Sequence, residues 1–201
     1  YQERILKSIN RTIGTLYLLQ VVLFSCVLIM FRISITYSEI LGFIIFLSVL
    51  HIGLWIFLSI MHDHFTVIPT GEKLDRINLA NTLTLFRISS TPLTGFLIIL
   101  MQKYKVLPAL IPIIFIVFLT DLFDGAIARG TRQITKIGKY LDSISDYSIL
   151  IVVSITLTWY KAISDWLFLL ILFRYVKGCS QSFLLNGCNY TSSQACFRGS
   201  E

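Results

Sequence analysis

The chain has 201 residues, of which 55% are hydrophobic and 14% are charged, and its mean hydropathy is +0.77. Soluble domains are about 45–50% apolar and about 25% charged, so this composition excludes an ordinary water-soluble domain. The formal net charge of +6 comes without a basic stripe interleaved with aromatic residues, which argues against nucleic acid as a partner. The four cysteines are irregularly spaced and predict neither a disulfide framework nor a zinc site.

Apolar stretches that approach the thickness of a bilayer recur along the chain. A helix needs about 20 apolar residues to cover about 30 Å of hydrocarbon. Five stretches meet or approach that length, namely 12–31, 40–61, 83–100, 107–120 and 141–159. The fourth spans only if its helix continues to Ala128, and a sixth, 166–176, spans only if it runs on to Leu184. We therefore predict an all-α, polytopic membrane bundle of about six transmembrane helices.

Basic residues are distributed unevenly between the predicted loops. One set of loops carries Arg4, Lys7, Arg11, Lys73, Arg76, Arg129, Arg132, Lys136 and Lys139. The alternate set carries only Arg32, Lys103, Lys105 and Lys161. Because Lys and Arg concentrate in cytoplasmic loops, the N-terminus and the loop after Thr120 are predicted to be cytoplasmic. We divide the chain into an N-terminal pair of spans (1–66), a second group of spans (67–176) and a polar tail (177–201).

Four of the 11 acidic residues lie between Asp121 and Asp146, at the ends of two apolar stretches. Ionisable groups beside membrane spans are costly and indicate function. Asp121 and Asp124 are spaced i,i+3, and Asp142 and Asp146 are spaced i,i+4, so each pair lies on one helix face. A short connection lets the two helices pack antiparallel, and all four carboxylates then converge.

Converging carboxylates repel one another unless cations neutralise them. Oxygen donors suit Mg²⁺ or Mn²⁺, and four carboxylates fit two ions about 3.5–4 Å apart, as in phosphoryl transfer. The structural alternative is that the acids cap helix ends and pair with basic loop residues.

Small residues beside these acids predict a groove. Gly125 and Ala128 share a face with the first pair of aspartates, and Gly138 lies one turn before Asp142. We expect their missing side chains to leave room for a nucleotide pyrophosphate, with Arg129 pairing with its oxygens.

The same residues form a family signature. The run Asp121-Leu-Phe-Asp124-Gly125-Ala-Ile-Ala128-Arg129, followed at fixed spacings by Gly138, Asp142 and Asp146, resembles the motif of CDP-alcohol phosphotransferases. The stretch from Asn81 to Arg87, followed by Pro92, resembles the start of that family's first helix. The resemblance covers residues 78–174.

The resemblance implies a membrane enzyme that joins a CDP-activated group to an alcohol and releases CMP. The implied metal ligands are Asp121, Asp124, Asp142 and Asp146, and Asp146 is also the implied general base. The positions that resemble those holding the CDP moiety are Asn81, Thr82, Leu83, Thr84, Gly125, Arg129 and Thr135. The family also implies a homodimer and two further spans after Arg174. Because the chain turns polar there, we expect 67–176 to be an incomplete core.

We therefore predict a magnesium-dependent phosphatidyltransferase that uses CDP-diacylglycerol at the cytoplasmic face. The acceptor is a small alcohol: the pattern from Asn81 to Pro92 favours glycerol 3-phosphate, whereas 142–147 resembles relatives that use serine or inositol. A cation transporter lined by the aspartates and a catalytically silent scaffold are the alternatives. Arg87 is expected either to snorkel to the interface or to face a phosphate, and His51 to make a helix-packing hydrogen bond.

Overall fold

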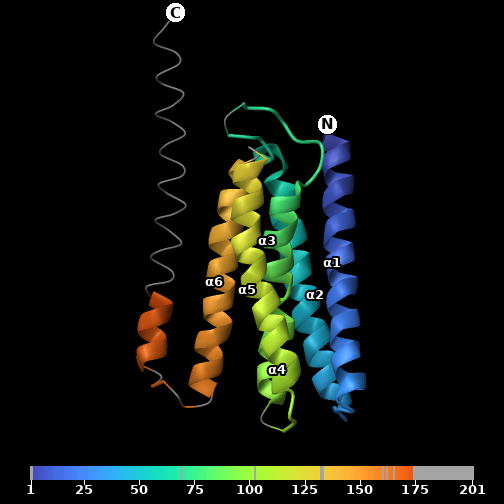
Figure 1. Ribbon diagram of the computed structural model, residues 1–201, viewed down its shortest axis with the longest axis vertical. Helices are drawn as coiled ribbons and strands as arrows, with labels where there is room; N and C mark the ends of the chain where they lie inside the picture. Colours follow the sequence, from blue (N-terminus) through green and yellow to red (C-terminus); the bar gives the residue numbers. More distant parts are fainter. Residues whose placement is uncertain are drawn as a thin grey trace, which may run out of the picture. The chain divides into compact units, whose positions relative to one another are not determined.

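The computed structural model describes residues 2–68, 70–101, 103–131, 134–159, 161, 163, 164 and 166–173. Within the helices, it leaves out the side chains of residues 121, 122, 124–126, 128, 129, 153, 156, 157 and 159. The described chain is a helical membrane bundle (Figure 1), as predicted, and contains no β-strand. It divides into two compact units, Tyr1–Val152 and Val153–Glu201. The predicted polar tail lies outside the described residues.

The first two helices are long and pack against each other. They are α1 (Gln2–Met30) and α2 (Tyr37–Ile60). α1 begins well before the apolar stretch that predicted it, because Ile5, Ile9 and Ile13 repeat at helical spacing on its buried face. Hydropathy alone misses this first part, whose exposed face is polar and charged.

The next predicted span is interrupted. It consists of α3 (Leu79–Ser89) and α4 (Thr91–Leu100), separated by Ser90. Pro92 accounts for the break because proline has no N–H to donate and its ring crowds the carbonyl four residues earlier. The 22 residues from Leu79 to Leu100 are nevertheless long and apolar enough to cross a membrane as one span.

Two further helices complete the first unit and carry the motif. α5 (Leu107–Gly130) runs on past Thr120, the continuation that the short fourth stretch required. α6 (Lys136–Trp159) begins before its apolar stretch and passes into the second unit, where residues 166–173 are also helical. By length and apolar composition, three described segments qualify as spans: α1, α2 and the α3–α4 rod. The other predicted spans stay predictions.

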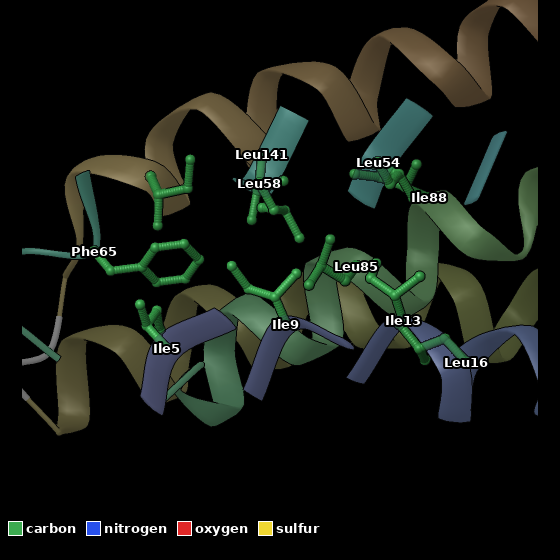
Figure 2. Close-up of a cluster of buried hydrophobic side chains, with 11 residues drawn as sticks. Ile5, Ile9, Ile13, Leu16, Leu54, Leu58, Phe65, Leu85, Ile88 and Leu141 are labelled. Atoms are coloured by element: carbon green, nitrogen blue, oxygen red, sulfur yellow. The ribbon is translucent and has the colours of Figure 1, made fainter. Parts of the chain in front are cut away.

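Buried apolar side chains of the first unit form two clusters. The site-end cluster consists of Ile5, Ile9, Ile13, Leu16, Leu54, Leu58, Phe65, Leu85, Ile88, Ile137 and Leu141. The far-end cluster consists of Phe24, Val27, Ile33, Phe43, Leu47, Leu93, Leu97, Leu100, Val106, Ala109 and Leu110. Figure 2 shows the site-end cluster, in which side chains of α1, α2, α3 and α6 meet around one apolar centre and Phe65 lies beside Ile5.

The linker between α2 and α3 is bound to the loop that precedes α6. It starts with a short 3₁₀ helix, η1 (His62–His64), and turns back at Gly71, whose φ of 69° favours glycine. Ile68 donates its N–H to the Ile134 carbonyl over 2.8 Å, and the Lys136 N–H donates to the Thr66 carbonyl over 3.1 Å. The start of α6 is therefore fixed by a segment that belongs to the N-terminal part of the chain.

Candidate functional site

Two of the predicted metal ligands lie one turn apart on α6 and meet a single arginine. Arg87 of α3 places its Nη2 3.0 Å from Asp142 Oδ1 and 3.3 Å from Asp146 Oδ1. Its Nε donates to the hydroxyl of Ser145, which lies between the two aspartates in sequence. The Asp142 and Asp146 side chains are 59% and 61% exposed, whereas that of Arg87 is 1% exposed. Both carboxylates therefore contact a buried cation and are also largely exposed.

The position of Arg87 corrects one of the two expectations for this residue. It does not snorkel to the interface, because its side chain is almost fully buried. Its guanidinium points at two carboxylates, and a contact with a phosphate stays a prediction. A buried arginine keeps its charge and must be paired, which explains why α3 packs with this side toward α6.

The first turns of α3 and α6 interlock through buried polar side chains. The Thr135 hydroxyl caps α6 by accepting from the Gly138 N–H over 3.0 Å. It also accepts from Asn81 Nδ2 over 3.0 Å, and both Asn81 and Thr135 are buried. On α3, Asn78 accepts from the Asn81 N–H over 3.0 Å as the N-cap. Asn81 and Thr135, both predicted to bind the CDP moiety, thus lie together at the site end of the bundle.

Gly138 does not open the groove that was predicted beside Asp142. A Cβ atom at this position would lie 2.7 Å from Asn81 Oδ1 and 2.9 Å from Thr135 Oγ1. The space is already filled by these two side chains, so the glycine serves close packing of α6 on α3. The groove prediction was wrong at this position because spacing along one helix says nothing about what a second helix places there.

The other predicted nucleotide-binding residues of α3 follow Asn81 directly. Thr82 and Thr84 donate their hydroxyl protons to the carbonyls of Asn78 and Ala80, four residues earlier, over 3.0 and 3.1 Å. Thr84 is buried, while Thr82 and Leu83 are half-buried. The contact of these residues with a CDP moiety stays a prediction.

The remaining predicted site residues lie on α5. This helix contains the backbones of Asp121, Asp124, Gly125 and Arg129, and the side chains of the two aspartates and the arginine lie outside the described part of the structure. Among the described side chains, no group of three or more His, Cys, Asp or Glu could hold a metal ion.

The two described carboxylates fit half of a site for a hard cation. Both are oxygen donors, and both already neutralise a positive group placed between them. Both side chains are more than half exposed, so a cation from solution can reach them. We therefore find the α6 pair compatible with Mg²⁺ or Mn²⁺.

Hydrogen bonds to α2 and α1 hold the end of α3. His51 of α2 lies with Nε2 2.9 Å from the Ser89 hydroxyl, and its Nδ1 donates to the Leu47 carbonyl over 2.8 Å. The expected packing role of His51 is confirmed. Gln20 of α1 donates to the Ser90 hydroxyl over 3.0 Å. These contacts fix α3 immediately beyond Arg87.

Sequence reasoning missed three polar residues that hold the site. Ser145 shares the helical face of the α6 aspartates at i+3 from Asp142, so its spacing offered a usable signal. Gln20 and Ser90 gave a weaker one: each is a polar residue inside or beside an apolar stretch, and such residues tend to pair across helices. These two residues are bonded to each other, but they lie 70 residues apart in sequence, so the pairing could not be assigned without a fold.

Comparison with known proteins matches the part of the chain that carries this site. The sequence model of the CDP-alcohol phosphatidyltransferase family matches residues 77–194. A CDP-diacylglycerol–glycerol-3-phosphate 3-phosphatidyltransferase of Cereibacter sphaeroides is 29% identical over 102 residues, which cover 49% of this chain and 46% of that protein. One of Wigglesworthia glossinidia brevipalpis is 37% identical over 78 residues, covering 38% of this chain and 42% of that protein.

These alignments are partial. The chain spans about half the length of the curated relatives it matches. No solved structure gives a significant match. The family match nevertheless extends over more than half of the chain and contains α3, the motif and the α6 aspartates. The chain belongs to the CDP-alcohol phosphatidyltransferase family.

Proposed function

We propose that this protein transfers a phosphatidyl group from CDP-diacylglycerol to a small alcohol and releases CMP, in phospholipid synthesis. The observation that carries the proposal is the pair of exposed α6 carboxylates, Asp142 and Asp146, which converge on one point within the family motif. The names of the similar proteins favour glycerol 3-phosphate as the acceptor.

Asp146 is proposed as the general base. Transfer forms a bond between the acceptor oxygen and the β-phosphorus of the donor and breaks the bridge to the α-phosphate, so that CMP leaves with the bridging oxygen. The acceptor hydroxyl loses its proton during this step, and a carboxylate within hydrogen-bond reach can take it. Asp146 is suited to this role because its side chain is 61% exposed and can meet an acceptor that arrives from outside.

Two Mg²⁺ ions are proposed to be held by Asp121, Asp124, Asp142 and Asp146. When bound, they would neutralise the donor's pyrophosphate and the charge that develops on the departing CMP. Arg129 of α5 is proposed to pair with the same phosphate oxygens, and Asn81 and Thr135 to line the nucleotide side.

The site is proposed to face the cytoplasm at the level of the lipid headgroups. The start of α1, the start of α3, the end of α5 and the start of α6 lie at one end of the first unit (Figure 1). The described basic residues at this end include Arg4, Lys7, Lys73, Arg76 and Lys139. Such an excess favours the cytoplasmic side and attracts anionic lipids.

The proposal is tested by CMP release. The full chain in mixed micelles is supplied with labelled CDP-diacylglycerol and Mg²⁺, together with glycerol 3-phosphate, serine, inositol or inositol phosphate in parallel. We expect CMP with glycerol 3-phosphate. Absence of CMP with every acceptor contradicts the proposal, and cation flux into liposomes without CMP would favour a transporter.

A further inference from the structure

Arg87 carries a charge that the proposed chemistry does not use. It is the largest of the fully buried side chains in the described residues, with 1% of its surface exposed. A guanidinium remains ionised in proteins, and burying an unpaired charge costs several kcal/mol. The fold tolerates Arg87 because α6 supplies carboxylates for it.

The contacts of Arg87 follow one face of α6. Its guanidinium bonds to Asp142, Ser145 and Asp146, which are spaced i, i+3 and i+4. One nitrogen, Nη2, serves both carboxylates, so their Oδ1 atoms point at the same place. Without this nitrogen, two carboxylates one turn apart would repel each other and turn away.

Ser145 holds the guanidinium, and contacts with α2 and α1 hold the end of α3 that follows Arg87. Ser145 bonds to Nε, while Ser89 and Ser90 are held by α2 and α1. The positive charge therefore stays beside the carboxylates. A divalent ion held by these carboxylates would be repelled by this fixed positive charge.

We propose that Arg87 is a positioning residue that acts as the built-in counter-cation of the α6 carboxylate pair. It holds Asp142 and Asp146 in a convergent arrangement before any divalent ion binds, and its charge weakens the affinity of the pair for that ion. The role of the ion rests on the proposed function, whereas the pairing of Arg87 does not.

The test is the thermal unfolding temperature of the full chain, measured against Mn²⁺ concentration without any substrate. Arg87→Gln keeps an unbranched aliphatic stem and a hydrogen-bond donor but is shorter and removes the charge. We expect it to unfold at a lower temperature without Mn²⁺, and its Mn²⁺ midpoint to fall at least about tenfold because a repelling charge is gone. An arginine that only fills space would leave the midpoint unchanged or raise it, and either result overturns the proposal.

Two matched variants separate charge from packing. Arg87→Lys keeps the charge, and Ser145→Ala removes only the neutral partner of the guanidinium. We expect both to keep a Mn²⁺ midpoint within about threefold of the wild type. A midpoint that falls in Ser145→Ala as far as in Arg87→Gln contradicts the proposal.

A double variant covers the case in which Arg87→Gln does not fold. Arg87→Gln with Asp142→Asn removes one charge of each sign, so we expect it to unfold at a higher temperature than Arg87→Gln alone. Additive losses overturn the proposal. A wild type that binds Mn²⁺ but releases no CMP refutes the proposed function and leaves this inference standing. A wild type with no Mn²⁺ response refutes the weakening of ion affinity.

Discussion

The two ends of the first unit are packed differently around the two helices that they share, α1 and α2. The far-end cluster contains a stacked pair of aromatic rings: those of Phe24 and Phe43 have centroids 3.9 Å apart, and the partly buried Phe96 meets Phe24 edge-on at 5.4 Å. The site-end cluster is mainly aliphatic and lies beside buried polar contacts of Asn81 and Arg87. The comparison indicates that apolar packing holds the helices together at the far end. At the site end, buried polar contacts also position charged side chains.

The largest effect on stability is therefore expected at the far end. Phe43→Ala removes a ring that is 1% exposed and leaves a cavity among α1, α2 and α4. Because the unfolded side chain would face lipid rather than water, the loss comes mainly from packing, and we expect about 2–3 kcal/mol. The measurement is the free energy of unfolding in mixed micelles.

Phe46→Ala is the matched control for this substitution. Phe46 lies on the same helix and is 50% exposed, so its removal creates no internal cavity. CMP release per folded molecule should stay at the wild-type level in both variants. An equal loss of stability in the two would show that the far end is not the tightly packed region.

A smaller loss of stability with a loss of activity is expected at the site end. Gly138→Ala would place a methyl group 2.7 Å from Asn81 Oδ1, so the amide must move and its contact with Thr135 is weakened. We expect about 1–3 kcal/mol of destabilisation and reduced CMP release. Thermal unfolding and initial rates measure the two effects.

Gly14→Ala is the matched control for Gly138. Nothing lies within 4 Å of a Cβ built at Gly14, which is also inside a helix. Alanine there should leave stability unchanged or raise it by up to about 1 kcal/mol, because alanine favours helices over glycine. If Gly138→Ala and Gly14→Ala have the same stability and the same rate of CMP release, the close approach of α3 and α6 is not required for either property.

The smallest effect is expected for the ion pair in the far-end loop. Lys103 lies 2.7 Å from the Glu39 carboxylate, and this partner raises the pKa of Lys103 above its usual 10.5. A raised pKa in the folded state stabilises at pH values below 10.5, and the contribution is lost as the pH rises through the folded pKa. Lys103→Met should lower the unfolding temperature slightly at neutral pH and low salt, and the difference should vanish at strongly alkaline pH.

Lys105→Met, at an exposed position of the same loop, is the control and should show no such pH dependence. A large, salt-insensitive loss in Lys103→Met would contradict the view that the far end relies on packing rather than on charge.

The helices were predictable wherever a long apolar stretch marked a whole helix. Apolar length gave α2 and the α3–α4 rod, because a bilayer demands long apolar stretches. The beginning of α1 was missed although Ile5, Ile9 and Ile13 carry the helical period, because hydropathy averages out an amphipathic turn. The bridge between Val67 and Thr135 was not predictable, since it joins segments far apart in the chain.

The candidate site was predictable as a set of residues but not as a set of contacts. Spacing placed Asp142 and Asp146 on one face of α6, and the structure agrees. It could not say that Arg87, more than 50 residues earlier, would be buried between them. Gly138 shows the same limit. The sequence singled out this glycine as part of a groove, whereas in the structure Asn81 fills the space beside it.

The central claim is that the exposed carboxylates of α6 perform the chemistry. Its most direct test is CMP release from CDP-diacylglycerol and glycerol 3-phosphate, compared at equal amounts of folded wild type, Asp146→Asn and Asp63→Asn. Asp63 is an exposed aspartate of η1, so Asp63→Asn makes the same chemical change away from α6. We predict that Asp146→Asn loses roughly 10²-fold or more in rate, while Asp63→Asn keeps the wild-type rate. Undiminished CMP release by Asp146→Asn would contradict the account.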